Sequence, residues 1–169
     1  MLARVLETSE FDFAGGQLKP IRYDYTRSGM GKSKQAFIAF DYGSKTLQHQ
    51  DGTSEFIGGT LDKLSYQYQL TLDLANLASS ERSSNTFEYV VADGDKLKNY
   101  RFRVAGEEVL ATLTGDILTV KIERVREHDS DRKTTFWLAK DHDYLLTKFK
   151  QQGKGKSFEL NLESFTLNQ

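Results

Sequence analysis

Apolar and polar side chains alternate with a period of two along nearly the whole chain. Successive side chains of a strand point to opposite faces of a sheet, so this period is typical of strands with one buried face. It predicts strands at about 2–13, 20–28, 34–41, 45–50, 86–92, 97–105, 107–113, 117–126, 132–140, 144–151 and 157–167. Since short turns separate most of these strands, we expect an antiparallel meander.

The composition also favours a mainly β fold, in a single domain spanning residues 1–169. The chain has 11 Phe and 8 Tyr but only 1 Pro, which suits half-buried pleated surfaces. Its 23 Lys and Arg balance 24 Asp and Glu, so no basic excess favours a nucleic acid partner. The lack of Cys excludes disulfides and thiolate chemistry. No window approaches the ~20 apolar residues of a membrane span, so we expect no integral membrane segment.

Gly115-Asp116 predicts a two-residue hairpin loop that would fix the register of the strands beside it. Leu113 would then face Leu118, and further apolar pairs would follow on the same side of the sheet. One pair conflicts with this register: Glu108 would face Glu123, and like charges directly opposite each other are destabilising. We therefore expect a slip or a bulge near that end.

The polar stretch REHDSDRK predicts the next loop, centred on Asp129. This register places Ile122 opposite Phe136 and continues the apolar face across a third strand. It also places Lys121 opposite Trp137, which predicts a cation–π pair on the other face.

One segment, residues 60–77, is predicted as a helix, although its apolar residues fit both periods. The ends of the segment favour the helix. Gly58-Gly59 interrupts the chain, Thr60 can cap a helix, and the carboxylate of Asp62 suits a positive first turn. The run is also longer than a usual strand.

Gly31-Lys32-Ser33 resembles the end of a phosphate-binding P-loop but lacks the rest of that motif. Thr26 stands where a P-loop needs glycine, and a strand-like run follows where a helix is required. We interpret the segment as a connection in which Gly29 and Gly31 adopt positive φ.

Residues able to carry catalysis are few and scattered, so neither a cofactor nor an enzyme activity is predicted. None of His49, His128 and His142 has a partner at metal-ligand spacing. No serine lies on a G-x-S-x-G elbow. A hydrolase built on the loop 141–143, with Asp141, His142 and Asp143, stays open as a third alternative. Ion pairs with neighbouring Glu are favoured over a binding stripe for these arginines: Arg22, Arg101, Arg103, Arg124 and Arg126.

The aromatic-rich face of the meander is the predicted binding surface. We expect the sheet to form a barrel or half-barrel, with the helix packed on or in its concave face. Such a face can hold an apolar ligand such as a lipid acyl chain. The alternative is a solidly packed core and a structural or interaction module that meets another protein. The expected ligand-facing residues are Tyr23, Tyr25, Ile38, Phe40, Tyr89, Tyr100, Phe102, Val120, Phe136 and Leu160.

Several segments, in order along the chain, resemble a bacterial family known as domain of unknown function 3108. They are GGQLKPIRYDYTRSG, TLDKLSYQYQLTLDLA, YVVADGDKLKNYRFRVAGEEVL, TVKIERVRE and DRKTTFWLAKDHDYLLTKFKQ. The resemblance implies an exported, periplasmic all-β protein of the Gram-negative envelope and brings no catalytic residues. Members of that family usually begin with a signal peptide and further strands, so this chain is expected to be N-terminally shortened. The resemblance implies no particular oligomeric state.

Overall fold

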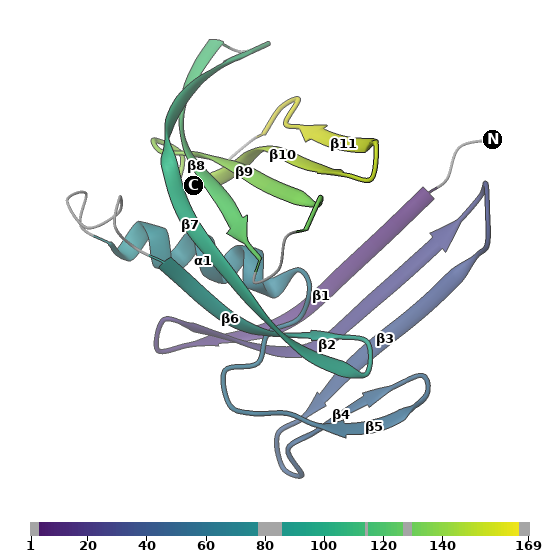
Figure 1. The fold of residues 1–169 in the computed structure, drawn as a ribbon. Helices are drawn as coiled ribbons and strands as arrows, with labels where there is room; N and C mark the ends of the chain where they lie inside the picture. Colours follow the sequence, from purple (N-terminus) through teal and green to yellow (C-terminus); the bar gives the residue numbers. More distant parts are fainter. Residues whose placement is uncertain (1–3, 78–85, 114, 127–129, 166–169) are drawn as a thin grey trace. The chain divides into compact units, whose positions relative to one another are not determined.

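The computed structural model describes residues 4–77, 86–113, 115–126 and 130–165, which form strands and one helix (Figure 1). The mainly β, antiparallel fold predicted from the sequence is therefore confirmed. The helix is α1 (Ser65–Asn76). The strands are β1 (Arg4–Ala14), β2 (Gln17–Ser28), β3 (Lys34–Asp41), β4 (Thr46–His49), β5 (Gly52–Glu55), β6 (Thr86–Asp93), β7 (Lys96–Thr112), β8 (Gly115–Val125), β9 (Lys133–Ala139), β10 (Leu145–Gly153) and β11 (Lys156–Asn161).

The chain divides into two compact units, and each is built from two separate stretches of sequence. The first unit comprises Met1–Leu70 and Tyr89–Asn99, and the second comprises Thr71–Glu88 and Tyr100–Gln169. The boundaries fall within α1, β6 and β7, so these elements contribute residues to both units.

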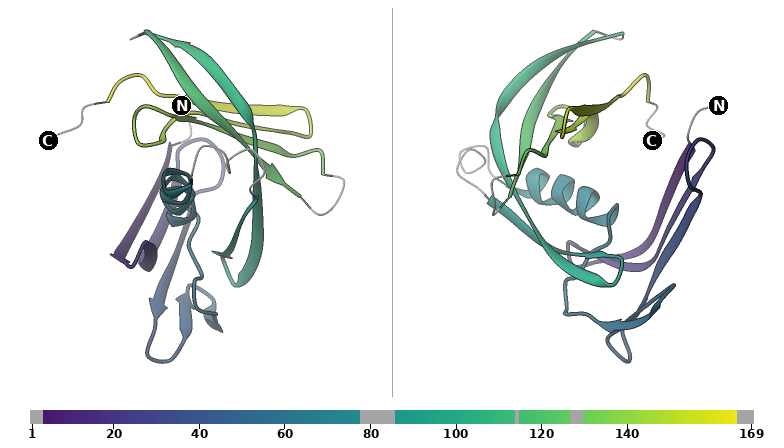
Figure 2. Two further views of the ribbon diagram at one scale, coloured as in Figure 1. Left: turned by 90° about the vertical axis from the view of Figure 1, so that its left-hand side faces the viewer. Right: turned by 45° about the vertical axis from the view of Figure 1, so that its right-hand side comes forward.

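The first unit contains a five-stranded antiparallel sheet in the order β1-β2-β3-β4-β5, a meander in which sequence neighbours pair. Its longest strands, β1, β2 and β3, run side by side in Figure 2. Buried side chains of this unit form one core cluster: Tyr23, Ile38, Phe40, Leu47, Phe56 and Ala92. Within the cluster the rings of Phe40 and Phe56 meet edge to face, with centroids 5.5 Å apart, as close packing of aromatic side chains favours.

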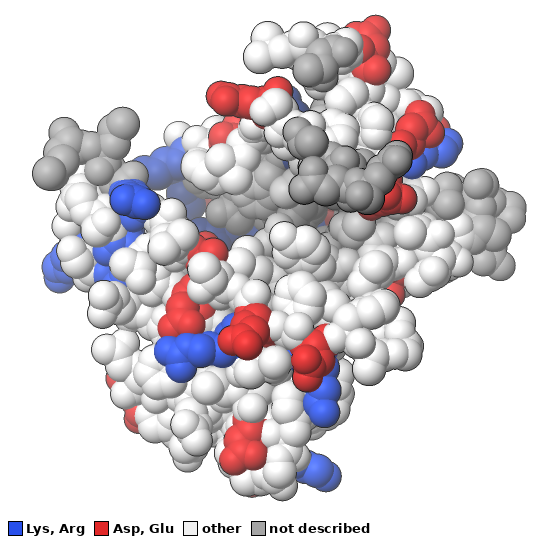
Figure 3. All heavy atoms as spheres, turned by 180° about the vertical axis from the view of Figure 1, so that it is seen from behind, with Lys and Arg blue, Asp and Glu red and all other residues white. Residues whose placement is uncertain are grey.

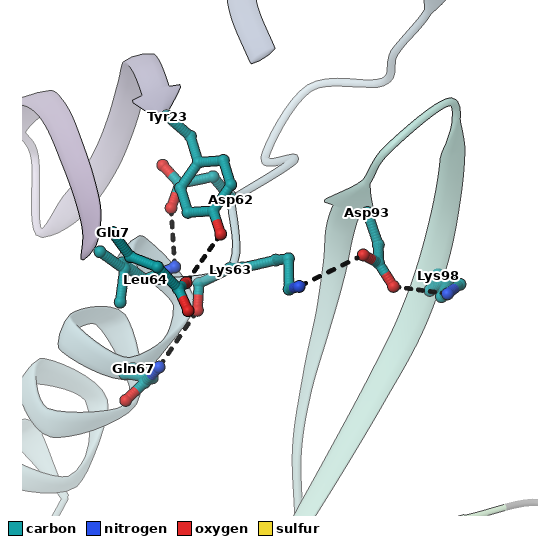
Figure 4. Close-up of polar contacts among 8 residues, drawn as sticks. All are labelled: Glu7, Tyr23, Asp62, Lys63, Leu64, Gln67, Asp93 and Lys98. Carbon is teal, nitrogen blue, oxygen red and sulfur yellow. Dashed lines mark hydrogen bonds and ion pairs between the residues drawn. The ribbon is translucent and has the colours of Figure 1, made fainter. Parts of the chain in front are cut away.

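A buried aspartate, Asp62, starts the helix (Figure 4). Its Oδ1 accepts hydrogen bonds from the backbone N–H groups of Leu64 and Ser65, at 2.8 and 2.9 Å. The hydroxyl of Ser65 in turn accepts a hydrogen bond from the backbone N–H of Asp62, at 2.8 Å. This reciprocal arrangement satisfies N–H groups that a helix terminus otherwise leaves without partners. The predicted helix exists, but it begins five residues later than position 60, and Asp62 rather than Thr60 provides the cap.

The first half of α1 is fixed to the turn between β1 and β2. The backbone N–H of Leu18 donates to Gln69 Oε1 at 2.8 Å, and Gln69 Nε2 donates to the carbonyl of Gly16 at 3.0 Å. The rings of Phe11 and Tyr68 also lie in contact, with centroids 5.8 Å apart. The buried amide of Gln69 therefore acts as a bridge between the helix and the hairpin, since its acceptor and a donor are both used.

The six-stranded sheet has the order β11-β10-β9-β8-β7-β6, again a meander. Neither sheet closes on itself, because β1 and β5 are the edge strands of one, and β6 and β11 are those of the other. The structure is thus an open meander in two sheets rather than a closed barrel. The strand orders are compatible with the half-barrel form of the prediction.

The register predicted from the polar loop between β8 and β9 is confirmed. Ile122 pairs with Phe136. Lys121 pairs with Trp137 as expected, and its Nζ lies 5.5 Å from the centroid of the indole.

The register predicted for β7 and β8 is wrong. Gly115 is the first residue of β8 and pairs with Thr112, so Gly115-Asp116 is not the hairpin loop. The expected conflict between Glu108 and Glu123 disappears, because Glu108 pairs with Thr119 and Glu123 pairs with Arg103. A register shift does occur, between Val104 and Gly106. The shift lies inside one long strand, β7, where the sequence had predicted two strands at 97–105 and 107–113.

Candidate functional site

Four of the predicted ligand-facing residues belong to the core cluster of the first unit or pack against it. Tyr23, Ile38 and Phe40 are buried in the core cluster, and Tyr25 packs against it half-buried. The three buried side chains pack against one another in this structure, whereas Tyr25 also lines an open hollow of about 400 Å³ between β2 and β3. Tyr89, which is also half-buried, lies on β6 within the same unit.

The second unit holds the remaining five predicted residues. Tyr100, Phe102, Val120 and Phe136 are buried in the six-stranded sheet, whereas Leu160 on β11 is 52% exposed. The predicted set is therefore split between two sheets. Only its last member, Leu160, is open to solvent to this degree.

One row of apolar side chains crosses four strands of the six-stranded sheet. Ile122 pairs with Phe136, Phe136 with Phe149, and Phe149 with Leu160, so β8, β9, β10 and β11 each contribute one member. Paired residues of neighbouring strands point to the same face. Figure 1 shows these strands following one another toward the edge strand β11. We call this set, together with Phe158 beside Leu160, the apolar row.

The apolar row becomes more exposed from one end to the other. Ile122 and Phe136 are 0% and 1% exposed, whereas Phe158 and Leu160 are 55% and 52% exposed. Successive rings contact each other, since Phe136 and Phe149 lie 5.2 Å apart and Phe149 and Phe158 lie 6.2 Å apart, between centroids. The row thus begins in the core and ends on an open sheet edge.

An open hollow of about 920 Å³ adjoins the exposed end of the row. It lies between the connection from β8 to β9 and the turn from β10 to β11, and Phe158 forms part of its wall. Glu127, His128 and Asp129 of the first connection lie outside the described residues, so the predicted position of His128 in a loop is not described. We call the hollow the basic groove after its charged lining: Arg126, Arg132, Lys154 and Lys156, with Asp131 as the carboxylate.

Two local structures place these cations. Arg126 Nε donates to the carbonyl of Arg132 at 2.9 Å and Arg126 Nη2 donates to Thr134 Oγ1 at 3.1 Å, which holds the connection against the sheet. Lys154 and Gly155 have φ values of 50° and 72°. Two successive residues with positive φ are the geometry of a type I′ hairpin turn, and the glycine adopts it without strain.

The two loops of the basic groove touch each other. A Cβ placed on Gly153 would lie 3.1 Å from Cα of Arg132, closer than side chains normally approach a backbone. A side chain at position 153 would therefore require the backbone of Arg132 to move by a few tenths of an ångström, so glycine suits this approach. The contact brings Arg132 next to the turn that carries Lys154, and Lys156 follows two residues later.

The opposite face of the same sheet is charged, and there the charges are paired. Trp137 lies between Lys121 and Lys148, whose Nζ atoms are 5.5 and 5.2 Å from its ring centroid, and its Nε1 donates to Glu108 at 2.9 Å. Lys148 also pairs with Glu159 at 3.1 Å. Red and blue groups adjoin at several places on the surface shown in Figure 3. Cations with carboxylate or aromatic partners are partly neutralised, so this face is a poor attractant for anions.

Ion pairing was predicted for the arginines of the strands and is found for three of them. Arg101 pairs with Glu88 at 2.6 Å, and Arg103 pairs with Glu123 at 2.8 Å. Arg22 pairs with Asp24 within β2 instead of across strands, at 2.7 Å. Arg124 instead stacks on an aromatic ring, and Arg126 donates hydrogen bonds to the carbonyl of Arg132 and to Thr134. The guanidinium carbon of Arg124 lies 3.4 Å from the ring centroid of Tyr100.

Near the start of the helix, several polar side chains of the first unit interact (Figure 4). The phenol of Tyr23 donates to Glu7 Oε2 at 2.7 Å. Burial, and then this hydrogen bond, raise the pKa of Tyr23. Burial alone would raise the pKa of Asp93, but the ammonium groups of Lys98 and Lys63 lower it overall. Each of these groups has a partner of complementary character, which is what structural polar groups require.

The other sequence candidates are separated in the structure. The P-loop-like Gly31-Lys32-Ser33 lies between β2 and β3, and Gly29 and Gly31 have the expected positive φ, at 91° and 96°. In the loop 141–143, His142 contacts the ring of Phe165, with centroids 5.0 Å apart. Among the described residues, no three His, Asp or Glu side chains gather as a metal site would require.

Comparison with protein families gives a match over residues 1–161 to the family described as protein of unknown function (DUF3108). The chain belongs to this family. The resemblance predicted from the sequence is thus confirmed. The matched range includes every residue of the apolar row and the basic groove of this DUF3108 chain. Neither the curated proteins nor the solved structures gave a match.

Four site residues of the DUF3108 chain were not among the predicted site residues. Phe149 lies on β10, and Arg132, Lys154 and Lys156 lie at or beside the two connections that border the groove. A signal was present in the sequence KGKS, where Lys154-Gly155 is a hairpin-turn pair with a second lysine beside it. The pairing of β9 with β10, which sets Lys133 opposite Gln152, brings Arg132 close to that turn. Among the described residues, no helix combines the length and apolar character needed to cross a membrane.

Proposed function

We propose that this protein is a non-enzymatic binding protein of the bacterial cell envelope that holds an apolar chain, such as a lipid acyl chain, at the exposed end of the apolar row. One observation carries the proposal: the row does not end in the core but continues to Phe158 and Leu160, both more than half exposed, beside the open groove. The resemblance of the sequence to exported proteins supports the envelope location.

The physical basis is the removal of apolar surface from water. Phe158 and Leu160 are neighbours on one face of an edge strand, next to the half-buried ring of Phe149. An acyl chain lying along them would extend the apolar row by one member and cover both side chains. Burying apolar surface contributes roughly 25 cal/mol per Å², so an aliphatic chain gains free energy there without a specific hydrogen bond.

The test is direct binding of a neutral lipid to the protein and to two matched variants. We expect the wild-type protein to bind a monoacylglycerol in isothermal titration calorimetry and Leu160→Ser to bind it about fivefold more weakly, since roughly 1 kcal/mol of apolar contact is lost. The control is Leu6→Ser on β1, because Leu6 is 55% exposed but belongs to the other sheet.

Both variants change an exposed side chain, so they should fold. A charged substitution at Phe102, in contrast, would fail to fold, because that ring is fully buried. If the wild-type protein binds no monoacylglycerol, or if both variants weaken binding equally, the apolar row is not the binding site. Native mass spectrometry of protein purified from its own bacterium, with solvent extraction, would then identify the class of the natural ligand.

The exposed edge of β11 favours a second function, the pairing of this strand with a strand of another envelope protein. All of its residues are exposed, and β10 is its only partner within the six-stranded sheet. Unpaired backbone groups of an edge strand are a ready template for strand addition. A protein that carries no lipid but retains a defined partner, lost when Pro replaces Glu159, would support this second function instead.

A further inference from the structure

We propose that the basic groove binds a phosphate group, so that the ligand is a phosphorylated amphiphile whose chain lies on the apolar row. This inference rests on the proposed function and names the chemical class of its ligand. The groove and the row share Phe158, which lines the groove and contacts Phe149 of the row. A molecule with an anionic head and an apolar tail could therefore occupy both at once.

The charge of the groove is the first argument. Four cationic side chains and one carboxylate, Asp131, are among the residues that line it. Three of the cations, Arg132, Lys154 and Lys156, have no ion pair or side-chain hydrogen bond within the part of the chain that the structure describes. Unpaired cations gathered in one concave site raise the local concentration of anions.

The contrast with the opposite face of the same sheet is the second argument. There Lys121, Lys148 and Lys150 each have a carboxylate partner, at 3.9, 3.1 and 3.8 Å. Those pairs show that nearby strands of this sheet do supply carboxylates to lysines. Among the described residues, Arg132, Lys154 and Lys156 are thus grouped without such partners at one end of the sheet.

The architecture of the groove is the third argument. The close approach of Gly153 to the backbone of Arg132 fixes the two loops against each other, and Arg126 ties the first loop to Thr134. The positions of the cations are therefore set by backbone contacts. Arginine suits a phosphate because its planar fork can donate two parallel hydrogen bonds, while lysine contributes a compact charge.

The experiment compares two ligands that differ only in the phosphate: lysophosphatidic acid and the monoacylglycerol with the same acyl chain. Titration calorimetry below the micelle-forming concentration gives the affinity of each. We expect the wild-type protein to bind lysophosphatidic acid about tenfold more tightly, the sum of a few exposed charge contacts. That preference should decrease as sodium chloride is added, because salt screens exposed charges.

The decisive variant is the triple substitution Arg132→Gln, Lys154→Asn and Lys156→Gln. Asn tolerates the positive φ of position 154, so the turn is kept while its charge is removed. We expect the triple variant to bind the two lipids equally. The matched control is Lys45→Asn, which removes an exposed lysine with a φ of 57° from a turn of the other sheet and should keep the tenfold preference.

The outcomes separate this inference from the proposed function. If the wild-type protein binds both lipids with equal affinity, the phosphate site is refuted, while binding of an acyl chain at the apolar row is still supported. If the wild-type protein binds neither lipid, both the proposed function and this inference are refuted. Inorganic phosphate is the third ligand: if it binds as tightly as lysophosphatidic acid, the groove takes free phosphate and not a lipid head group. A tenfold preference that survives the triple variant also overturns the inference.

Discussion

Replacing Asp62 with alanine should destabilise the first unit more than replacing any exposed acid of the chain. The carboxylate is fully buried and accepts three hydrogen bonds. Oδ1 receives the backbone N–H groups of Leu64 and Ser65, and Oδ2 receives the hydroxyl of Ser9 at 2.6 Å. It therefore caps the helix and also connects the helix to β1.

The expected cost follows from these contacts. Loss of a helix cap costs about 1 kcal/mol, and loss of a hydrogen bond to a charged acceptor costs roughly 2 kcal/mol when the donor stays partly buried. Asp62→Ala should thus lower the free energy of unfolding by about 3 kcal/mol, or the melting temperature by roughly 6–12 °C for a chain of this length. Asp62→Asn should cost only about 1 kcal/mol, because asparagine is also a good cap and its amide can donate to Ser9.

Two measurements check this reasoning. Thermal unfolding followed by circular dichroism gives the order wild type, Asp62→Asn, Asp62→Ala. Amide hydrogen exchange tests the cap itself, since the amides of Leu64 and Ser65 should lose protection in Asp62→Ala and keep it in Asp62→Asn. Adding Ser9→Ala to Asp62→Ala should cost little more, because the two groups share one hydrogen bond. A loss below 1 kcal/mol in Asp62→Ala, or unchanged exchange of both amides, would refute the capping role.

Two further predictions concern a tyrosine and two glycines. Burial, and then the charges of nearby acids, raise the pKa of Tyr42 to about 12, so its absorbance should titrate well above the ordinary tyrosine value of about pH 10. Because the folded state favours the neutral phenol, stability should be complete below about pH 10, the ordinary pKa, and fall toward pH 12. Gly106→Ala should cost about 1–2 kcal/mol from backbone strain alone, since φ is 126° and the added Cβ meets nothing. Gly58→Ala, with equal space and no positive φ, should be neutral or slightly stabilising in the same unfolding assay. An equal loss of unfolding free energy in the two glycine variants, or a Tyr42 whose absorbance titrates at about pH 10, would contradict these predictions.

The strands were predictable where alternation and turn chemistry agreed. Between β8 and β9 the polar loop left one apolar register, and the pairing of Ile122 with Phe136 was correct. Between β7 and β8 the pair Gly115-Asp116 had the residues of a turn, but Gly115 instead begins a strand at a φ of 120°. A glycine permits a turn without requiring one, so the register depends on the total apolar burial of the sheet. The short strand β5 was missed because it contains no apolar residue.

The division into two sheets was not predictable from alternation. A period of two shows that a strand has two faces, but it carries no information about which other strands share its apolar face. For this reason Tyr23 and Phe136 looked alike in the sequence, although they belong to different sheets. The basic groove was hidden for a related reason. Arg132 and Lys154 are far apart in sequence, and the pairing of β9 with β10, which sets Lys133 opposite Gln152, brings their loops together.

The exposed end of the apolar row, Phe158 and Leu160 on β11, favours a binding role over a role in core packing alone. A sheet that only needs a core can end its apolar face with a polar edge strand, which also protects against aggregation. β11 does the opposite, since Phe158 and Leu160 point to the apolar face and stay more than half exposed. On its other face Glu159 is paired with Lys148. The charged face of β11 is thus paired, while its exposed apolar face lies next to Lys154 and Lys156, for which the described residues supply no carboxylate. An amphiphile with a phosphate head would cover both, and the matched lipid pair tests that combination.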